Sequence, residues 1–261
     1  MGYQLKYILL FASLSFAGAL DYAYGTQYGK AFSEIAEEDS SACVLKGIVL
    51  VMRFDDLGDT LDLSNALSIL KNCKTTNFWE PMRRYKIGLI NSLFGNTFKS
   101  IAETRSAALI FEKREDIDSK AFYAIYAYYA PFVKFKQEDL KNGFERSNQF
   151  PFVFGNSLIW ILYEEKKYAE ALDVANALLK RYPAHPTLLQ TKAEMLFYLG
   201  KAEEAITMFK ESEQLYAKRA PNSIRYWCAV AHLAKMTGDA QWKEKLKSDE
   251  YKAIKRWMPK I

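Results

Sequence analysis

Two stretches in the second half of the chain decide the fold: SLIWILYEEKKYAEALDVANALLKRYP at 157–183 and TKAEMLFYLGKAEEAITMFKESEQLYA at 191–217. In each, apolar residues recur every three or four positions on either side of a short polar turn, which predicts two amphipathic helices. The stretches superpose at a constant offset, so that Ala171 falls on Ala205 and Leu162 on Leu196. A fixed offset between two helical pairs indicates an internal repeat.

This repeat resembles the tetratricopeptide repeat, a helix–turn–helix unit of about 34 residues, which is also the offset between the two stretches. The family's small residue in the second helix matches Ala171 and Ala205, and its closing proline matches Pro183. Its small residue in the first helix matches Ala193, whereas Ile159 stands there in the preceding unit. The match is specific over 152–217 and degenerate on both sides, with a third unit from Ile224 and a fourth at YKIGLINSLFGNTFKSIAETRSAAL (85–109).

The remainder of the chain also shows the helical period and no sustained strand alternation. Helices are predicted in SSACVLKGIVLVMRF (40–54), LDLSNALSILKNC (61–73), PMRRYKIGLINSLFG (81–95) and SKAFYAIYAYYAPF (119–132). The least regular stretch, EDLKNGFERSNQFPFVF (138–154), is the expected joint between the halves. The predicted fold class is therefore all-α, an α-solenoid of antiparallel helical hairpins.

The N-terminus has the pattern of a secretory signal. The basic segment MGYQLK precedes YILLFASLSFAGAL (7–20), which is uncharged but shorter than the roughly 20 residues of a membrane span. We expect a signal peptide over 1–19, with Ala23-Tyr24-Gly25 as a second cleavage choice; an uncleaved anchor or a buried first helix are the alternatives. The expected domains are hairpins at 26–150, repeats at 151–240 and a basic amphipathic capping helix at 241–261.

Three cysteines stand in the chain, and their spacing fits neither a zinc site nor a full disulfide framework. Cys43 and Cys73 lie 30 residues apart. If they bracket a helical hairpin, the start of its first helix meets the end of its second, which allows a disulfide. The alternative is that both are small buried hydrophobic residues.

Chemistry-bearing motifs are absent from the sequence. His185 and His232 have no partner at metal-ligand spacing, and His185 is expected to be a solvated turn residue. The acidic pair Asp55 and Asp56 sits beside an expected turn and fits solvated capping. The net charge of +5 is too small and scattered for a nucleic-acid surface. We therefore expect no catalytic residues, no metal, no cofactor and no nucleic-acid partner.

The tetratricopeptide resemblance implies a concave groove that binds a protein or peptide. Carried over position by position, the groove residues are Asn156, Trp160, Tyr163, Gln190, Glu194, Phe197, Arg225 and His232. The alternative for Trp160 and Phe197 is burial against the next repeat. The predicted function is an exported, non-enzymatic adaptor or scaffold, located in a bacterial periplasm or secreted, with no transmembrane span in the mature chain.

Two other features suit different partners. The aromatic helix around Tyr123–Tyr129 fits either core packing or a cavity for a solute or lipid, so a ligand-binding protein accompanying an envelope transporter is the alternative function. The C-terminal stretch carries Trp242, Leu246, Ile254 and Trp257 along one side. It fits either weak contact with a membrane surface or packing on the last repeat.

Overall fold

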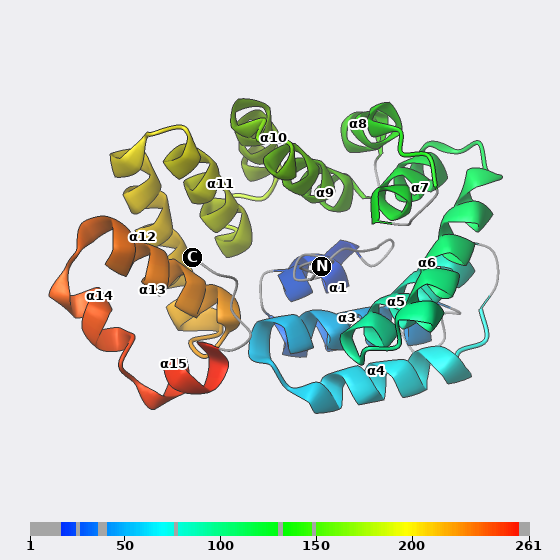
Figure 1. The fold of residues 1–261 in the computed structure, drawn as a ribbon, viewed down its shortest axis with the longest axis horizontal. Coiled ribbons are helices and arrows are strands. Elements are labelled where there is room, and N and C mark those ends of the chain that lie inside the picture. The colour runs from blue at the N-terminus through cyan, green and yellow to red at the C-terminus, as the bar shows by residue number, and fades with distance from the viewer. Residues whose placement is uncertain are drawn as a thin grey trace. The chain divides into compact units, whose positions relative to one another are not determined.

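The computed structural model describes residues 17–24, 27–35, 41–75, 78–129, 133–147 and 150–255. Every regular element in those ranges is a helix (Figure 1), which confirms the predicted all-α class. Most of the predicted signal peptide lies outside the described residues. Helix α1 (Ala17–Tyr24) begins inside it, and Ala19 is fully buried. Cleavage stays a prediction.

The chain divides into two compact units, each made of consecutive helices. The first unit comprises residues 1–21, 28–54 and 59–158, and the second comprises 22–27, 55–58 and 159–261. The division falls inside a helix, after Leu158, and not at the expected joint. The expected joint instead forms a helix of its own and the start of the next one.

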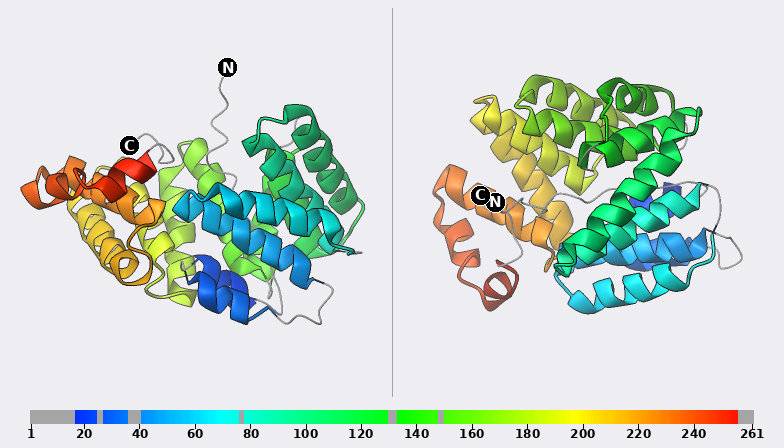
Figure 2. Two further views of the ribbon diagram at one scale, coloured as in Figure 1. Left: turned by 90° about the horizontal axis from the view of Figure 1, so that it is seen from below. Right: turned by 45° about the vertical axis from the view of Figure 1, so that its right-hand side comes forward.

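The first unit contains the helices of the N-terminal hairpins. They are α2 (Tyr28–Ser33), α3 (Ala42–Leu57, up to Phe54), α4 (Thr60–Asn72), α5 (Trp79–Leu93), α6 (Thr97–Glu112), α7 (Ile117–Tyr129), α8 (Gln137–Arg146) and the start of α9 (Pro151–Glu164). Consecutive helices from α4 to α8 pack against one another (Figure 2). Cys43, at the start of α3, and Cys73, just after α4, are joined by a disulfide with their Cα atoms 5.8 Å apart.

Aromatic residues form the core of the first unit. The Phe122 ring lies 4.8 Å from Phe150 and 4.9 Å from Phe154, and Tyr126 stacks on Tyr85 at 4.0 Å. Phe122 and Tyr126 are fully buried. The aromatic spacing of α7 therefore reflects core packing, and these rings give no support to a ligand cavity.

The second unit holds the repeats. It contains the end of α9, α10 (Tyr168–Arg181), α11 (Pro186–Tyr198), α12 (Ala202–Arg219), α13 (Ile224–Thr237), α14 (Ala240–Lys245) and α15 (Asp249–Ile254). The small residues Ala171, Ala193 and Ala205 are fully buried, as close packing between helices requires.

Turns at equivalent positions repeat the same hydrogen bonds. After α9, Lys166 N donates to Tyr163 O (2.9 Å) and Lys167 N to Leu162 O (2.8 Å). After α11, at the same positions of the next repeat, Gly200 N donates to Phe197 O (3.0 Å) and Lys201 N to Leu196 O (2.9 Å). The residue that reverses the chain is left-handed in both turns, with φ of 61° at Lys166 and 77° at Gly200. This shared geometry confirms the resemblance to a tetratricopeptide repeat.

The degenerate fourth unit makes the same turn. Between α5 and α6, Gly95 has φ of 79° and its N–H donates to Ser92 O, while Asn96 N donates to Asn91 O. Helices α5 and α6 approach closely at Gly88, where an added Cβ would lie 2.7 Å from Thr104 Oγ1. The α5–α6 hairpin is therefore a repeat unit in structure although its sequence match is weak.

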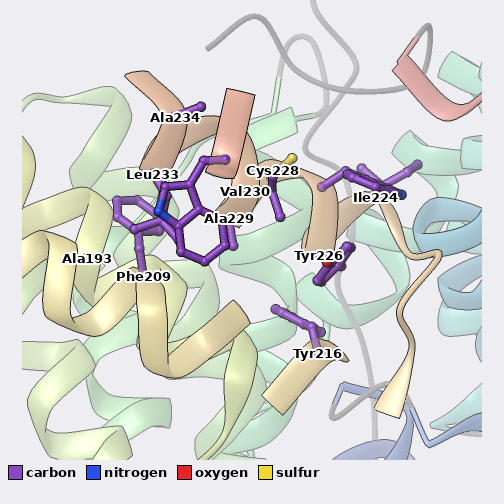
Figure 3. Close-up of a cluster of buried hydrophobic side chains, with 12 residues drawn as sticks. Ala193, Phe209, Tyr216, Ile224, Tyr226, Cys228, Ala229, Val230, Leu233 and Ala234 are labelled. Atoms are coloured by element: carbon purple, nitrogen blue, oxygen red, sulfur yellow. The ribbon is translucent and has the colours of Figure 1, made fainter. Parts of the chain in front are cut away.

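The core of the second unit lies where α11, α12, α13 and α14 meet (Figure 3). Its buried residues include Phe209, Tyr216, Trp227, Leu233 and Trp242. The third repeat ends in two short helices, and Leu246 packs against this core from the chain between them. The predicted single capping helix over 241–261 is therefore wrong: Ser248 breaks it by capping α15, its hydroxyl accepting a hydrogen bond from Tyr251 N. Trp257 lies outside the described residues.

No helix in the described part of the chain has both the length and the apolar character to cross a membrane. Within the same residues, no group of three or more His, Cys, Asp or Glu side chains is placed to hold a metal ion.

Candidate interaction site

Five aromatic residues of the second unit gather at the edge where the repeats turn. We call this set the aromatic edge: Trp160, Tyr163, Tyr168, Phe197 and Tyr198. They come from the last turn of α9, the first residue of α10 and the last turn of α11. The repeat geometry explains the meeting, because the equivalent turns of successive repeats lie side by side when their hairpins stack.

Ring contacts connect the aromatic edge across the two repeats. Tyr168 stacks on Tyr198 with ring centroids 4.8 Å apart and planes 13° apart. Tyr163 meets Tyr198 edge to face at 5.4 Å, and their hydroxyls form a 3.0 Å hydrogen bond. Trp160 and Phe197 extend the set by edge-to-face contacts at 5.4 Å with Tyr163 and 5.6 Å with Tyr198. Such contacts hold the rings in fixed positions and so reduce the side-chain conformational entropy that is lost when a partner binds.

The aromatic edge keeps much apolar surface in contact with water. Phe197 is 37% exposed, Tyr198 is 47% exposed, and the adjoining Leu199 is 38% exposed. Two ion pairs lie beside it: Lys167 Nζ lies 2.7 Å from Glu165 Oε2, and Lys201 Nζ lies 3.4 Å from Glu204 Oε1. Contiguous exposed rings within a rim of balanced charge are typical of a protein-binding surface.

The eight predicted groove residues differ in burial and in the contacts that they make. Trp160, Tyr163 and Phe197 belong to the aromatic edge, whereas Asn156 lies in the first unit and is buried. His232 stacks its ring on Phe209 at 4.5 Å, and its Nδ1 lies 2.9 Å from Cys228 O. Asn156 therefore offers little surface to a partner, and the His232 ring is already in contact inside the protein; a binding role for either stays a prediction.

Three further predicted groove residues form a polar cluster with Asp56 and His185. Gln190 is buried and its Nε2 donates to Glu194 Oε1 at 3.5 Å, while Arg225 Nε donates to Asp56 Oδ1 at 2.7 Å. All five belong to the second unit. Asp56, expected to be a solvated cap, is 3% exposed. The expectation of a solvated His185 is also wrong, because it is 7% exposed. Partner binding by the polar cluster stays a prediction.

Burial dominates the acid–base behaviour of the polar cluster. It raises the pKa of Glu194 to about 7, against the hydrogen bond from Gln190 and the positive charge of Arg225, although part of the residue stays exposed. Burial and the nearby charges of Arg225 and Arg219 lower the pKa of His185 to about 3. At neutral pH the cluster therefore holds a neutral imidazole and a partly protonated carboxyl group.

Replacing Glu194 with Gln should stabilise the protein at pH 8 and not at pH 4. The folded-state pKa of Glu194, about 7, exceeds the value near 4.3 of an unfolded chain, so its contribution to stability is lost as pH rises through that interval. Gln does not titrate and keeps the shape. We expect the free energy of unfolding of E194Q to exceed that of the natural protein by about 2 kcal/mol above pH 7, less than the full difference in pKa implies because the residue is partly exposed to solvent.

Urea titrations from pH 4 to pH 8 measure this difference, and His185 contributes equally to both proteins. Glu204, whose side chain is 60% exposed, supplies the control: E204Q should change stability little at any pH. A constant difference between E194Q and the natural protein across the whole range would show that the Glu194 carboxyl is ordinarily ionised in the fold.

No family model matches the sequence, and no curated protein matches it. Solved structures with similar folds include a tetratricopeptide repeat protein from Parabacteroides merdae, with 13% identity over 88% of this chain and 95% of that one, at a TM-score of 0.42. MamA from Desulfovibrio magneticus has 17% identity over 85% of this chain and 93% of that one, at a TM-score of 0.33. The TPR2AB domain of yeast Sti1 has 12% identity over 92% of this chain and 91% of that one, at a TM-score of 0.33. With TM-scores below 0.5, these similarities carry no conclusion about the partner of this chain.

Proposed function

We propose that this protein is a non-enzymatic scaffold that binds another protein through the aromatic edge. The observation that carries the proposal is the stacked and hydrogen-bonded Tyr163, Tyr168 and Tyr198, next to the exposed Phe197. Tyr and Trp are the residues that most often dominate binding energy at protein interfaces, since they bury much area with few rotatable bonds.

The contacts of the polar cluster favour a binding surface at the edge of the repeats. Arg225 pairs with Asp56, and Gln190 is buried against its neighbours, so a partner would have to replace internal contacts to reach them. The rings of the aromatic edge need no such exchange. A partner segment carrying apolar or aromatic side chains and few charges fits this surface best.

Export is part of the proposal. The N-terminal pattern of a basic segment followed by an apolar one supports it, and so does the disulfide between Cys43 and Cys73, because disulfides persist in oxidising compartments. The proposed location is a bacterial periplasm or the extracellular medium. Cell fractionation with mass spectrometry of the N-terminus tests it. A chain that stays in the cytoplasm with Met1 intact would contradict it.

Quantitative capture tests the binding surface. Four full-length baits are compared: the natural protein, Tyr198→Ser, Tyr168→Ser and a control variant. The proteins captured by each bait are identified and quantified by mass spectrometry. The control is Tyr251→Ser, which removes a partly buried tyrosine of the same unit that packs on the core and not on the aromatic edge. We expect one protein to be lost with both edge variants and kept with the control. Equal capture by all four baits would contradict the proposal.

A further inference from the structure

The outward side of α6 carries apolar side chains that stay exposed among the residues described by the structure. Phe98, in the first turn, is 91% exposed, and Ile101 and Leu109 are 39% and 38% exposed. At the preceding turn, Leu93 and Phe94 are 38% and 43% exposed. We call these five residues the α6 face. They make up half of the large hydrophobic residues that are exposed among the described residues.

Helix geometry separates the α6 face from the side of α6 that packs in the protein. Positions 98, 101, 105 and 109 follow the three-to-four spacing of one helical stripe. Ala107 and Phe111, on the other side, are fully buried, as is Ala108 at the margin beside Ile101, and α6 packs against α5 and α7 (Figure 1). A helix that is apolar on two sides buries both of them in its working state.

Positive charges outnumber negative ones around the α6 face. Lys99, Arg105 and Lys113 are exposed, and none of the three forms an ion pair with the described residues. Of the acidic residues of the same helix, Glu103 pairs with Arg84 at 3.2 Å, and the exposed Glu112, which accepts a hydrogen bond from Tyr123 at 3.4 Å, leaves one negative charge beside three cations. A surface that covers this side of α6 is therefore expected to carry negative charge.

We propose that the α6 face lies on an anionic membrane surface, with Phe94 and Phe98 inserted among the lipid headgroups. An apolar row flanked by lysine and arginine is the pattern of a helix at a membrane interface. Phe98 stands almost entirely in water, and a bilayer receives such a side chain without a shaped pocket. The cations match the negative potential of the lipid headgroups.

This contact is separate from the protein-binding role of the aromatic edge. The α6 face lies in the first unit and the aromatic edge in the second. It also differs from the membrane contact first considered for the C-terminus, where Trp242 is buried in the core. A scaffold with both surfaces would hold its protein partner at a membrane.

Vesicle flotation tests the proposal with the full chain. Vesicles contain phosphatidylcholine alone, or phosphatidylcholine mixed with anionic phosphatidylglycerol. We expect binding to the anionic vesicles, weakened by added salt, and little binding to the neutral ones. Phe98→Ser should weaken binding at least about tenfold, because it removes the phenyl ring that inserts among the lipid headgroups. Lys99→Glu and Arg105→Glu should each weaken it by roughly fivefold or more.

Leu61→Ser is the matched control, since Leu61 is 61% exposed on α4, outside the α6 face. It should bind vesicles like the natural protein. All variants carry the same N-terminus, so a retained leader would affect each equally. The proposal is overturned if the natural protein binds neither vesicle, or if Phe98→Ser and Leu61→Ser bind alike. It is also overturned if light scattering shows a dimer that Phe98→Ser dissociates, because a second copy would then cover this side.

Discussion

Replacing Cys43 and Cys73 together with serine should lower the free energy of unfolding by about 3–4 kcal/mol. The disulfide closes a loop of 30 residues that contains most of α3 and all of α4. Without the disulfide, the unfolded chain gains conformational entropy. For a loop of this length, that gain lowers the free energy of unfolding by the amount given above. Urea unfolding of the two proteins under oxidising conditions measures the difference.

Reductant supplies the control for this prediction. It should destabilise the natural protein by about the same amount and leave the double serine variant unchanged, because the remaining cysteine, Cys228, is buried and forms no disulfide in the structure. The hairpin has other ties, including Arg53 Nε donating to Asp62 Oδ2 at 2.7 Å, so we expect the variant to fold. Identical stability with and without the two cysteines would contradict the expected cross-link.

Replacing Arg225 with Met should cost about 3 kcal/mol of stability. The Asp56 side chain, which is 4% exposed, would lose the guanidinium nitrogen that now lies 2.7 Å away. A buried charge without its partner is expensive because neither water nor an opposite charge compensates it. The double variant Asp56→Asn with Arg225→Met should be less destabilised than the sum of the two single changes.

An exposed ion pair provides the comparison. Lys247 and Glu244 lie 2.5 Å apart with side chains 71% and 72% exposed, and Lys247→Met should change the unfolding free energy by less than about 1 kcal/mol. If Arg225→Met costs no more than Lys247→Met, the Asp56 carboxylate is hydrated and the polar cluster is open to solvent. In that case the predicted concave groove, and not the aromatic edge, would be the expected binding surface.

The repeat was predictable because its signals are local. The small residues Ala171 and Ala205, the constant spacing between the units and the turn at Gly200 each report a contact between neighbouring helices. The C-terminus differs from its prediction for a local reason too: its apolar side predicts one helix, whereas Ser248 caps a separate one. A serine followed by Asp249 and Glu250 is a helix-start signal that could have divided that stretch.

The site was only half predictable. Trp160, Tyr163 and Phe197 follow from the repeat positions, but Tyr168 and Tyr198 occupy positions that differ between the units, so the repeat offset does not relate them. Their stacking depends on how neighbouring turns lie together in space. The pair of Asp56 and Arg225 is separated by 169 residues, and nothing in the local sequence of either indicates the other.

Site-specific photocrosslinking in living cells tests the central claim most directly. A photoreactive phenylalanine is placed at Tyr198, in the aromatic edge, or at Met236, which is partly buried on the core of the same unit. The account predicts one discrete crosslinked partner at Tyr198, weakened by Tyr168→Ser, and none at Met236. Absence of any crosslink at Tyr198, or the same partner at both positions, would contradict a scaffold that binds through its aromatic edge.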